Sequence, residues 1–547
     1  MDWQVHWRAR SHFTIFDTGY GDGAAWRAVL RAWRDDPHRP PRLHYIALDA
    51  APLPGFRRIL QDDAGVTLDL LSLPLDTALA QLDARLDAIC LHHIAGQGSG
   101  FARALTRLCE PGAVLEASGL TDTQAHALGG AGFDCSEGPD GTISAVFTTR
   151  KPPSPWARKS EPERRAIVLG AGLAGAAACE RLCARGWQVT LVERHAHVAG
   201  EASGNQAGIF MPLLSKDDNI MTRLSRAAYL YALDYWGKLG DIDGDRCGVL
   251  QLARDGAHAQ VQRAIDEAHH YPLQFARWIE APEAAALAGV PAPDGAWVFA
   301  QGGWARPSSV CEAMLAACGP ALVRRFGVGN ASLARRGGEW EVLGPDGAMI
   351  ASAPVVIVAN GTGVLKLAQT AALPLAAVRG QVTHLAAGSL PALPHVLCRE
   401  AYLTPAVNGW HSLGASYDDD DDTALREASQ RDNLDKIRSL LGDPAIGLDA
   451  PLAGRVGFRC VAPDRLPLVG ALPEADAGGR IERLREVPRQ AGLYGLLGYA
   501  SRGLIWAPLA AELLAARLDG EALPLESELA AALDPARFLL RARKRPA

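Results

Sequence analysis

Short apolar runs alternate with amphipathic segments along most of the chain, a pattern that favours α/β domains. A first set predicts a small doubly wound domain, with apolar segments at 13–16, 43–48, 86–91, 101–109, 113–117 and 143–148. A second set begins at residue 166, where strands at 166–169 and 189–192 flank a helix at 176–185 that Gly186 ends. The alternation therefore predicts two α/β domains.

A segment rich in proline and charge, 151–165, separates the two sets. It reads K-P-P-S-P-W-A-R-K-S-E-P-E-R-R and lacks apolar periodicity, which is typical of an exposed linker. The predicted domains are therefore 1–150 and 166–547. A strand at 355–359 returns to the second sheet, so substrate-binding insertions are expected at about 241–353 and about 375–465, since such insertions usually carry function.

Composition is that of a large globular protein. The chain has 547 residues, 48% hydrophobic and 21% charged, with no apolar stretch of bilayer length and no apolar signal at the N-terminus, so a cytoplasmic location is expected. Its ten cysteines are scattered without a Cys-x-x-Cys pair, which predicts reduced thiols and no metal site. A net charge of −6 does not indicate a nucleic-acid binder, although a basic groove can exist on an acidic protein.

The strongest chemical motif is G-x-G-x-x-G in the segment 166–175, A-I-V-L-G-A-G-L-A-G, directly after a predicted strand. Gly170 permits the tight turn, Gly172 lets the backbone approach a pyrophosphate, and Gly175 lets the next helix pack closely on the strand. Glu193 ends the second strand, where an acid binds a ribose hydroxyl. This context favours a bound dinucleotide over an ordinary glycine-rich turn.

Two later loops are candidates for contacts with the same cofactor. A loop of small residues at 202–208 can wrap a second phosphate or the flavin side of a dinucleotide, with a plain loop as the alternative. A glycine-lined turn at 492–503 leads into an apolar helix at 504–518, whose positive N-terminus favours negative charge on a reduced flavin. The candidate residues in these loops are Ser203, Gly204, Asn205, Gly498, Ser501 and Gly503.

The first domain carries a second mononucleotide-binding pattern. The strand at 13–16 runs into D-T-G-Y-G-D-G, and the strand at 43–48 ends at an acid that is placed to hold ribose hydroxyls. Glycines at this spacing also occur in many ordinary loops. The candidate ligand-binding residues are Gly19, Gly21, Gly23 and Asp49.

Six ordered motifs resemble those of the MnmC family of bifunctional tRNA 5-methylaminomethyl-2-thiouridine biosynthesis proteins. The block F-R-C-V-A-P-D-R-L-P within 454–470 is the most specific of them. With the match at 533–541, the resemblance covers essentially all of 166–547. The other five motifs lie at 202–216, 302–307, 378–385, 402–406 and 501–514.

The resemblance implies an FAD-dependent oxidoreductase domain of the glycine and D-amino-acid oxidase type, with an inserted mixed-sheet substrate domain. It also implies a Rossmann-like methyltransferase domain that uses S-adenosylmethionine, with tRNA as the partner. The implied oxidation removes the carboxymethyl group from 5-carboxymethylaminomethyl-(2-thio)uridine at the wobble position, and methylation of the resulting amine follows. A bidentate arginine is the natural partner of the substrate carboxylate, and Arg502, Arg459 and Arg379 lie in matched motifs, each with a structural ion pair as the alternative.

The first domain departs from the family pattern at residues 86–94. In the family, this strand ends in an aspartate within D-G-F-A-P and precedes an N-P-x-M-W element, whereas here His92 takes the place of the aspartate and the rest is missing. The domain is also shorter than expected for the family. His92 is a candidate base, with a structural residue at a strand end as the alternative. We therefore expect the domain to retain binding of S-adenosylmethionine but to transfer the methyl group slowly or not at all.

Two other functions stay open at the level of sequence. One is a free glycine or D-amino-acid oxidase without an RNA partner, and the other treats 1–150 as a non-catalytic docking module. The five aspartates at 418–422 lack the alternating ligands and the glycine of a calcium loop, so a solvated loop is expected there.

Overall fold

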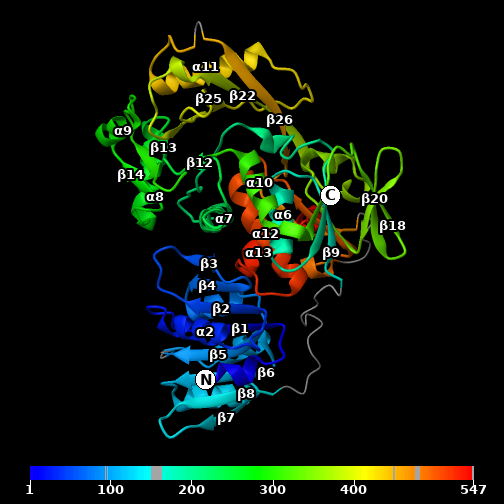
Figure 1. Ribbon diagram of the computed structural model, residues 1–547. Coiled ribbons are helices and arrows are strands. Elements are labelled where there is room, and N and C mark those ends of the chain that lie inside the picture. The colour runs from blue at the N-terminus through cyan, green and yellow to red at the C-terminus, as the bar shows by residue number, and fades with distance from the viewer. Residues whose placement is uncertain (93, 95, 149–162, 448–449, 475–480, 545–547) are drawn as a thin grey trace. The chain divides into compact units, whose positions relative to one another are not determined.

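The structure is a computed structural model that describes residues 1–547 except 93, 95, 149–162, 448–449, 475–480 and 545–547 (Figure 1). Its contacts divide the chain into two compact units. Unit 1 comprises Met1–Pro162 and Glu512–Ala531, and unit 2 comprises Glu163–Ala511 and Ala532–Ala547. Most of the predicted linker at 151–165 lies outside the described residues. Residues 512–531, which the sequence boundary assigns to the second domain, have their contacts in unit 1.

Unit 1 is built on an eight-stranded sheet with the order β3-β4-β2-β1-β5-β6-β8-β7 (Figure 1). The five strands from β4 to β6 are parallel, and the other three pair antiparallel. The order reverses between β1 and β5, so the carboxyl ends of these two strands form the crevice where such sheets bind ligands. The strands are β1 (His12–Asp17), β2 (Arg42–Leu48), β3 (Gly55–Leu60), β4 (Val66–Ser72), β5 (Leu86–His92), β6 (Cys109–Ser118), β7 (Phe133–Glu137) and β8 (Ile143–Phe147), and the helices are α1 (Trp3–Trp7), α2 (Ala24–Asp35), α3 (Leu75–Gln81), α4 (Gly100–Leu108) and α5 (Asp122–Gly130).

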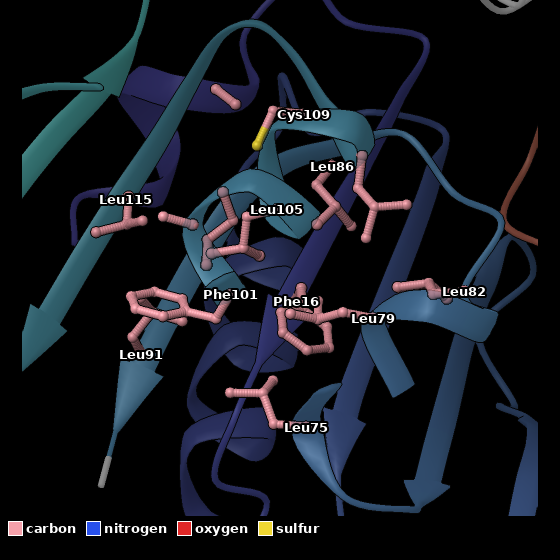
Figure 2. Close-up of a cluster of buried hydrophobic side chains, with 14 of the residues drawn as sticks. Phe16, Leu75, Leu79, Leu82, Leu86, Leu91, Phe101, Leu105, Cys109 and Leu115 are labelled. Atoms are coloured by element: carbon pink, nitrogen blue, oxygen red, sulfur yellow. The ribbon is translucent and has the colours of Figure 1, made fainter. Parts of the chain in front are cut away.

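Hydrophobic side chains cover both faces of this sheet. On one face Phe16 packs with Leu79 of α3 and Phe101 of α4 (Figure 2). On the other face Ile15 packs with Trp26 of α2. Successive residues of β1 belong to the hydrophobic clusters on opposite faces of the sheet, because strand side chains alternate between faces. The all-apolar run at 13–16 is therefore that of a strand buried on both sides, which matches a parallel sheet.

Buried charges bind residues 512–531 to β3 and β4 within unit 1. The side chain of Arg58 is fully buried, and it donates to both carboxylate oxygens of Asp69 at 2.8 and 2.6 Å. It also donates to Glu512 Oε1 at 2.9 Å and to the carbonyl of Ala522 at 2.8 Å. Burial raises the pKa of Asp69, and the Arg58 charge opposes that rise. Loss of Arg58 would therefore remove the buried positive charge that both Asp69 and Glu512 bind.

We expect Arg58→Met to destabilise unit 1 by about 3–5 kcal/mol, because breaking one side of a buried ion pair leaves an uncompensated charge. The free energy of opening is measured by hydrogen exchange at the amides of β4. Arg57→Met is the matched control, since Arg57 is the exposed neighbour on the same strand. Equal protection in the two variants would contradict a role for the buried charges.

Unit 2 contains the second nucleotide-binding sheet, with the order β17-β10-β9-β21-β28-β27. Its strands are parallel except β27, which pairs antiparallel with β28. The order reverses between β9 and β21, which again puts a crevice at the carboxyl ends. The strands are β9 (Arg165–Leu169), β10 (Gln188–Val192), β17 (Leu322–Arg325), β21 (Val355–Val358), β27 (Leu468–Pro473) and β28 (Arg489–Leu497). The helices of this part are α6 (Leu173–Cys183), α10 (Pro307–Ala317) and α12 (Gly503–Asp519), whose residues from Glu512 onward belong to unit 1.

An eight-stranded mixed sheet, in the order β14-β15-β13-β23-β24-β25-β22-β26, forms the second layer system of unit 2. The segments 241–353 and 375–465 supply all eight strands, but 241–353 also contains α10 and β17, which belong with the parallel sheet, so it is not purely an insertion. The strands are β13 (Val249–Leu252), β14 (Arg277–Ile279), β15 (Ala296–Phe299), β22 (Ala376–Ala386), β23 (Val396–Cys398), β24 (Tyr402–Leu403), β25 (Trp410–Gly414) and β26 (Leu452–Val461), with helices α7 (Ile220–Trp236), α8 (Gly256–His269), α9 (Ala281–Ala288) and α11 (Glu427–Leu441).

Two smaller sheets, two short α-helices and several 3-10 helices are also present among the described residues. One sheet has the order β11-β16-β12 and the other β18-β19-β20. The elements are β11 (Gly208–Phe210), β12 (Gly244–Asp245), β16 (Gly303–Ala305), β18 (Ser332–Arg336), β19 (Glu339–Leu343), β20 (Met349–Ala353), α13 (Ser527–Ala532) and α14 (Arg537–Lys544).

Candidate functional site

A cavity of about 480 Å³ lies in unit 2 at the carboxyl ends of β9, β10, β21 and β28 and extends onto β22 and β26. The first four strands meet at this edge because they run parallel, so their connecting loops converge. The other two bring side chains of the mixed sheet to the same space. The cavity therefore lies where the carboxyl edge of the parallel strands meets the mixed sheet.

The glycine turn after β9 has the conformation that its sequence predicts. Gly170 has φ +98°, and a Cβ there would lie 2.7 Å from the carbonyl oxygen of Ala359 at the end of β21. Gly172 lines the cavity in an extended conformation, immediately before α6. A Cβ on Gly175 would collide with the carbonyl oxygen of Gly170, so this glycine serves helix packing and does not line the cavity.

Glu193 follows β10 and organises the same turn. Its buried carboxylate accepts backbone N–H bonds from Ala171 at 2.7 Å and His195 at 2.9 Å, and the residue lines the cavity. Each carboxylate oxygen can accept more than one hydrogen bond. A ribose contact is therefore compatible with the observed bonds, and it stays a prediction.

The loop after β10 is tied to both the helix and the mixed sheet. Ser203 Oγ accepts the N–H of Leu173 at 3.2 Å, and both Ser203 and Asn205 line the cavity. Arg455 of β26 donates to the carbonyls of Gly200, at 2.9 Å, and Glu201. Arg455 is absent from the sequence-based set, although it lies in the same block as Arg459.

Gly204 has a packing role rather than a cavity-lining one. A Cβ there would lie 2.5 Å from Nη2 of Arg455, so a side chain would displace the guanidinium that holds the loop. The residue does not line the cavity, which corrects its assignment as a cofactor contact.

The turn before α12 adds further cofactor-type groups. Gly498, Ser501 and Gly503 all line the cavity, and α12 begins at Gly503, so its N-terminal N–H groups face this region. Among the described residues, the buried atoms Tyr499 Oη and Asn360 Oδ1 have no hydrogen-bond partner, and both residues line the cavity. Buried polar atoms need a partner, so these two atoms fit a polar cofactor.

The pairing of β22 with β26 separates two of the three candidate arginines. Arg459 lies opposite Val378, whereas Arg379 lies opposite Phe458. Residues directly opposite each other share a face and neighbours along a strand alternate, so Arg379 and Arg459 point to opposite faces. Of these two arginines, only Arg459 lines the cavity.

Arg379 is a buried structural residue. The Arg379 guanidinium donates to Asp418 Oδ2 at 2.9 Å. It also donates to the backbone carbonyls of Asp422 and Ala424, in each case at 2.7 Å. The side chain is fully buried and its donors are already used. The assignment of Arg379 as a carboxylate clamp is therefore corrected.

Arg459 and Arg502 both line the cavity. Arg459 donates to the carbonyl of Ser416 at 3.2 Å and lies 4.2 Å from the ring centroid of Tyr417. A Cβ on Gly380 would collide with its guanidinium, so this glycine provides the space for it. The Arg502 guanidinium makes no hydrogen bond or ion pair with any residue that the structure describes, and burial lowers its pKa. Arg502 therefore has donors available for an anion.

Two neutral groups stand near these arginines. Burial raises the pKa of Tyr402 to about 12, with the Arg459 charge opposing the rise, and burial raises the pKa of Cys398 to about 12. Both residues line the cavity, and both are uncharged at neutral pH. They do not compete with a bound carboxylate for the arginine charges. Neither was a candidate from the sequence, although Tyr402 lies in a matched motif.

The glycine loop of unit 1 lies at the carboxyl end of β1, beside β5. The N–H of Gly19 binds Asp17 Oδ1 at 2.8 Å, and the φ values of Gly21 and Gly23 are +55° and +78°. Gly23 precedes α2, so the loop leads into a helix N-terminus, as in the predicted pattern. Asp49 follows β2, where its Oδ1 accepts the N–H of Ala50 at 2.9 Å.

His92 ends β5 next to this loop. Its Nε2 lies 3.8 Å from Asp17 Oδ1, and its Nδ1 lies 3.3 Å from Ser118 Oγ. The side chain is 39% exposed, so it is accessible to a ligand at the crevice. Residues 93 and 95, in the segment where the family pattern is lost, lie outside the described residues.

The aspartate run at 418–422 is paired with arginines rather than merely solvated. Asp418 binds Arg379, while Asp420 and Asp422 bind Arg426 at 2.8 Å. Bonds from Arg426 lower the pKa of Asp420. Within the described parts of the chain, no group of three or more His, Cys, Asp or Glu side chains is arranged to hold a metal ion. No described helix is long and apolar enough to cross a membrane.

Comparison with known proteins connects this geometry to a family. Residues 165–517 match the family described as FAD dependent oxidoreductase. The bifunctional tRNA 5-methylaminomethyl-2-thiouridine biosynthesis protein MnmC of Aromatoleum aromaticum is 40% identical over 588 residues, 98% of this chain and 91% of the relative. Its counterpart in Burkholderia thailandensis is 40% identical over 610 residues, 100% of this chain and 92% of the relative.

The chain belongs to the MnmC family. Its second unit resembles iminodiacetate oxidase from Chelativorans sp., with 25% identity and a TM-score of 0.53 over 65% of this chain and 96% of that one. Glycine oxidase from Geobacillus kaustophilus has the same fold, with 19% identity and a TM-score of 0.55 over 68% and 99%. This MnmC-family chain is therefore an FAD-dependent oxidoreductase, as its sequence predicts, with a Rossmann-like unit at its N-terminus.

We expect Gly172→Val to abolish FAD binding, because the valine side chain would enter the space that a pyrophosphate occupies in such turns. Flavin absorbance is measured after purification and after reconstitution, with circular dichroism to verify folding. Gly237→Ala is the control, since Gly237 ends α7 and a Cβ there makes only ordinary contacts. Binding of S-adenosylmethionine by unit 1 should persist in both variants, and a yellow Gly172→Val protein would refute the assignment.

Proposed function

We propose that this protein oxidises 5-carboxymethylaminomethyl-(2-thio)uridine at the wobble position of tRNA to 5-aminomethyl-(2-thio)uridine. The observation that carries the proposal is the FAD-type cavity with Arg459 and Arg502 on its substrate side, in a chain of the MnmC family. We propose the cytoplasm as its location, since the substrate is tRNA.

The chemistry of the proposed step suits this cavity. FAD, when bound, supplies a hydride acceptor for the methylene carbon beside the substrate's secondary amine. The imine formed in the substrate then adds water and releases glyoxylate, which leaves a primary amine on the uridine. Arg502 and Arg459 would hold the leaving carboxylate by charge-assisted bonds and so orient the methylene group. The neutral Tyr402 and Cys398 leave that pairing undisturbed.

Unit 1 supports a second step in the same proposal. Gly19, Gly21, Gly23 and Asp49 are the groups we propose to bind S-adenosylmethionine, at the reversal point between β1 and β5. The amine would then approach His92. The alignment of 588 positions exceeds the 547 residues of this chain, so the relative has residues that this chain lacks. This difference agrees with the missing family element after β5.

Nucleoside mass spectrometry of tRNA tests the proposal directly. The tRNA carrying 5-carboxymethylaminomethyluridine is incubated with the enzyme, with and without S-adenosylmethionine. Conversion to 5-aminomethyluridine is expected in both samples. Oxidation of glycine or D-amino acids with no reaction on tRNA would instead support the alternative of a free amino-acid oxidase.

We expect Arg502→Met to lower kcat/KM for the carboxymethylaminomethyl substrate by about 10- to 150-fold, because a charge-assisted bond contributes about 1.5–3 kcal/mol. The loss should be smaller for an amine substrate without the carboxylate. Arg459→Met should have the second-largest effect, since Arg459 already binds a carbonyl. Arg379→Met is the comparison, and its effect should fall on stability rather than on discrimination between the substrates. Neutral behaviour of both Arg502 and Arg459 variants would eliminate the clamp.

We expect S-adenosylmethionine to bind while methylation of the product is slow or absent. In-line transfer needs accurate placement, and a displacement of about 1 Å can cost roughly 10²-fold. Calorimetry measures the binding, and the tRNA assay with S-adenosylmethionine measures the transfer. Rapid formation of 5-methylaminomethyluridine would overturn this expectation. Loss of that activity in His92→Ala, by about 10²- to 10⁴-fold, would then identify His92 as the base.

A further inference from the structure

Tyr417 is an aromatic residue at the cavity that the proposed chemistry does not use. It lines the cavity, yet its side chain is 65% exposed, which is unusual for a large aromatic group. Its sequence neighbours in the cavity wall, Gly414 and Ala415, are small. An exposed ring at the edge of a substrate cavity is a surface for contact with a planar ligand.

The backbone on both sides of Tyr417 is fixed to β22. The N–H of Ser416 binds the carbonyl of Gln381 at 3.1 Å, and Asp418 and Arg379 exchange two backbone bonds of 2.9 and 3.1 Å. Ser416 Oγ donates to Asp418 Oδ2 at 2.8 Å, and that carboxylate also accepts from Arg379. The ring is therefore exposed on a well-anchored segment, so a ligand would not have to order it.

The ring also has a cation against it. The Arg459 guanidinium lies 4.2 Å from its centroid, and Arg502 and Tyr402 line the same cavity as the ring. Both arginines of the proposed carboxylate clamp thus line the same cavity as this ring. A ligand stacked on the exposed side of Tyr417 would be within reach of both arginines through a short flexible substituent.

We propose that Tyr417 is the stacking platform for the uracil ring of the wobble nucleotide, which is extruded from the anticodon loop. This assignment rests on the proposed function. RNA-binding proteins recognise splayed-out bases by stacking them on aromatic side chains. The base would rest on Tyr417, and its C5 substituent would extend into the cavity toward Arg459 and Arg502. Arg379 and Asp418 are then positioning residues that hold the platform.

The test compares two substrates in one set of variants. The values of kcat/KM are measured for tRNA carrying 5-carboxymethylaminomethyluridine and for N-ethylglycine, a small secondary amine with a carboxylate and no base. Tyr417→Ala should lower the ratio of the tRNA value to the N-ethylglycine value by about 5- to 150-fold, the equivalent of about 1–3 kcal/mol per stacked base. Tyr417→Phe should keep the ratio within about threefold, because the ring is retained.

Controls separate stacking from other losses. Met349→Ala removes a side chain that is 60% exposed on β20, outside the cavity, and should leave both values unchanged. The slope of log affinity for tRNA against log salt should be the same in Tyr417→Ala and the native protein, because no phosphate contact is lost. An unchanged ratio in Tyr417→Ala, with the native enzyme active on tRNA, would overturn the platform alone. A native enzyme without activity on the modified tRNA would overturn the proposed function and the platform together.

Discussion

The pairing register of β22 with β26 is the constraint on which the substrate side of the cavity depends. Val378 opposite Arg459, and Arg379 opposite Phe458, commit the two arginines to different faces of one sheet. A shift of β26 by one residue would turn Arg459 to the face that Arg379 occupies, because side chains alternate along a strand. Gly380 completes the arrangement, since a side chain there would occupy the space of the Arg459 guanidinium. Arg459 consequently lines the cavity, whereas Arg379 stabilises the fold.

The sequence predicts both nucleotide-binding sheets because their signals are local. A buried strand, a glycine turn and an acid after the next strand lie within about 30 residues, and the geometry of Gly170, Gly172 and Glu193 follows from these features. The prediction fails where the information is not local. The face of Arg379 depends on pairing with a strand about 80 residues away, and the place of Glu512 depends on a buried bond to Arg58. Neither relation can be recognised in a single sequence, so the sequence does not rank the three arginines securely, although it places Arg502 first and Arg459 second.

The two units follow the same construction rule with different results. Each sheet reverses its strand order beside the strand that precedes the glycine turn, so each puts a helix N-terminus and an acid at one edge. In unit 2, orphaned polar atoms and a second sheet enclose that edge, whereas in unit 1 the histidine beside the loop, His92, is 39% exposed and lies 3.8 Å from Asp17. Cofactor binding needs the edge alone. Catalysis needs walls that hold the second substrate, which is why the oxidation is the better supported of the two activities.

The charge of the cavity favours binding of the proposed substrate over binding of the product. The substrate would enter with a carboxylate that Arg459 and Arg502 attract, and the reaction removes that carboxylate as glyoxylate. The uridine that remains carries a primary amine, which is a cation at neutral pH. The same two guanidinium groups repel it, and in a partly buried site that repulsion is poorly screened. Arg459 and Arg502 therefore bind the product less tightly than the substrate. The product can then leave for a second reaction without any other group in the cavity to expel it.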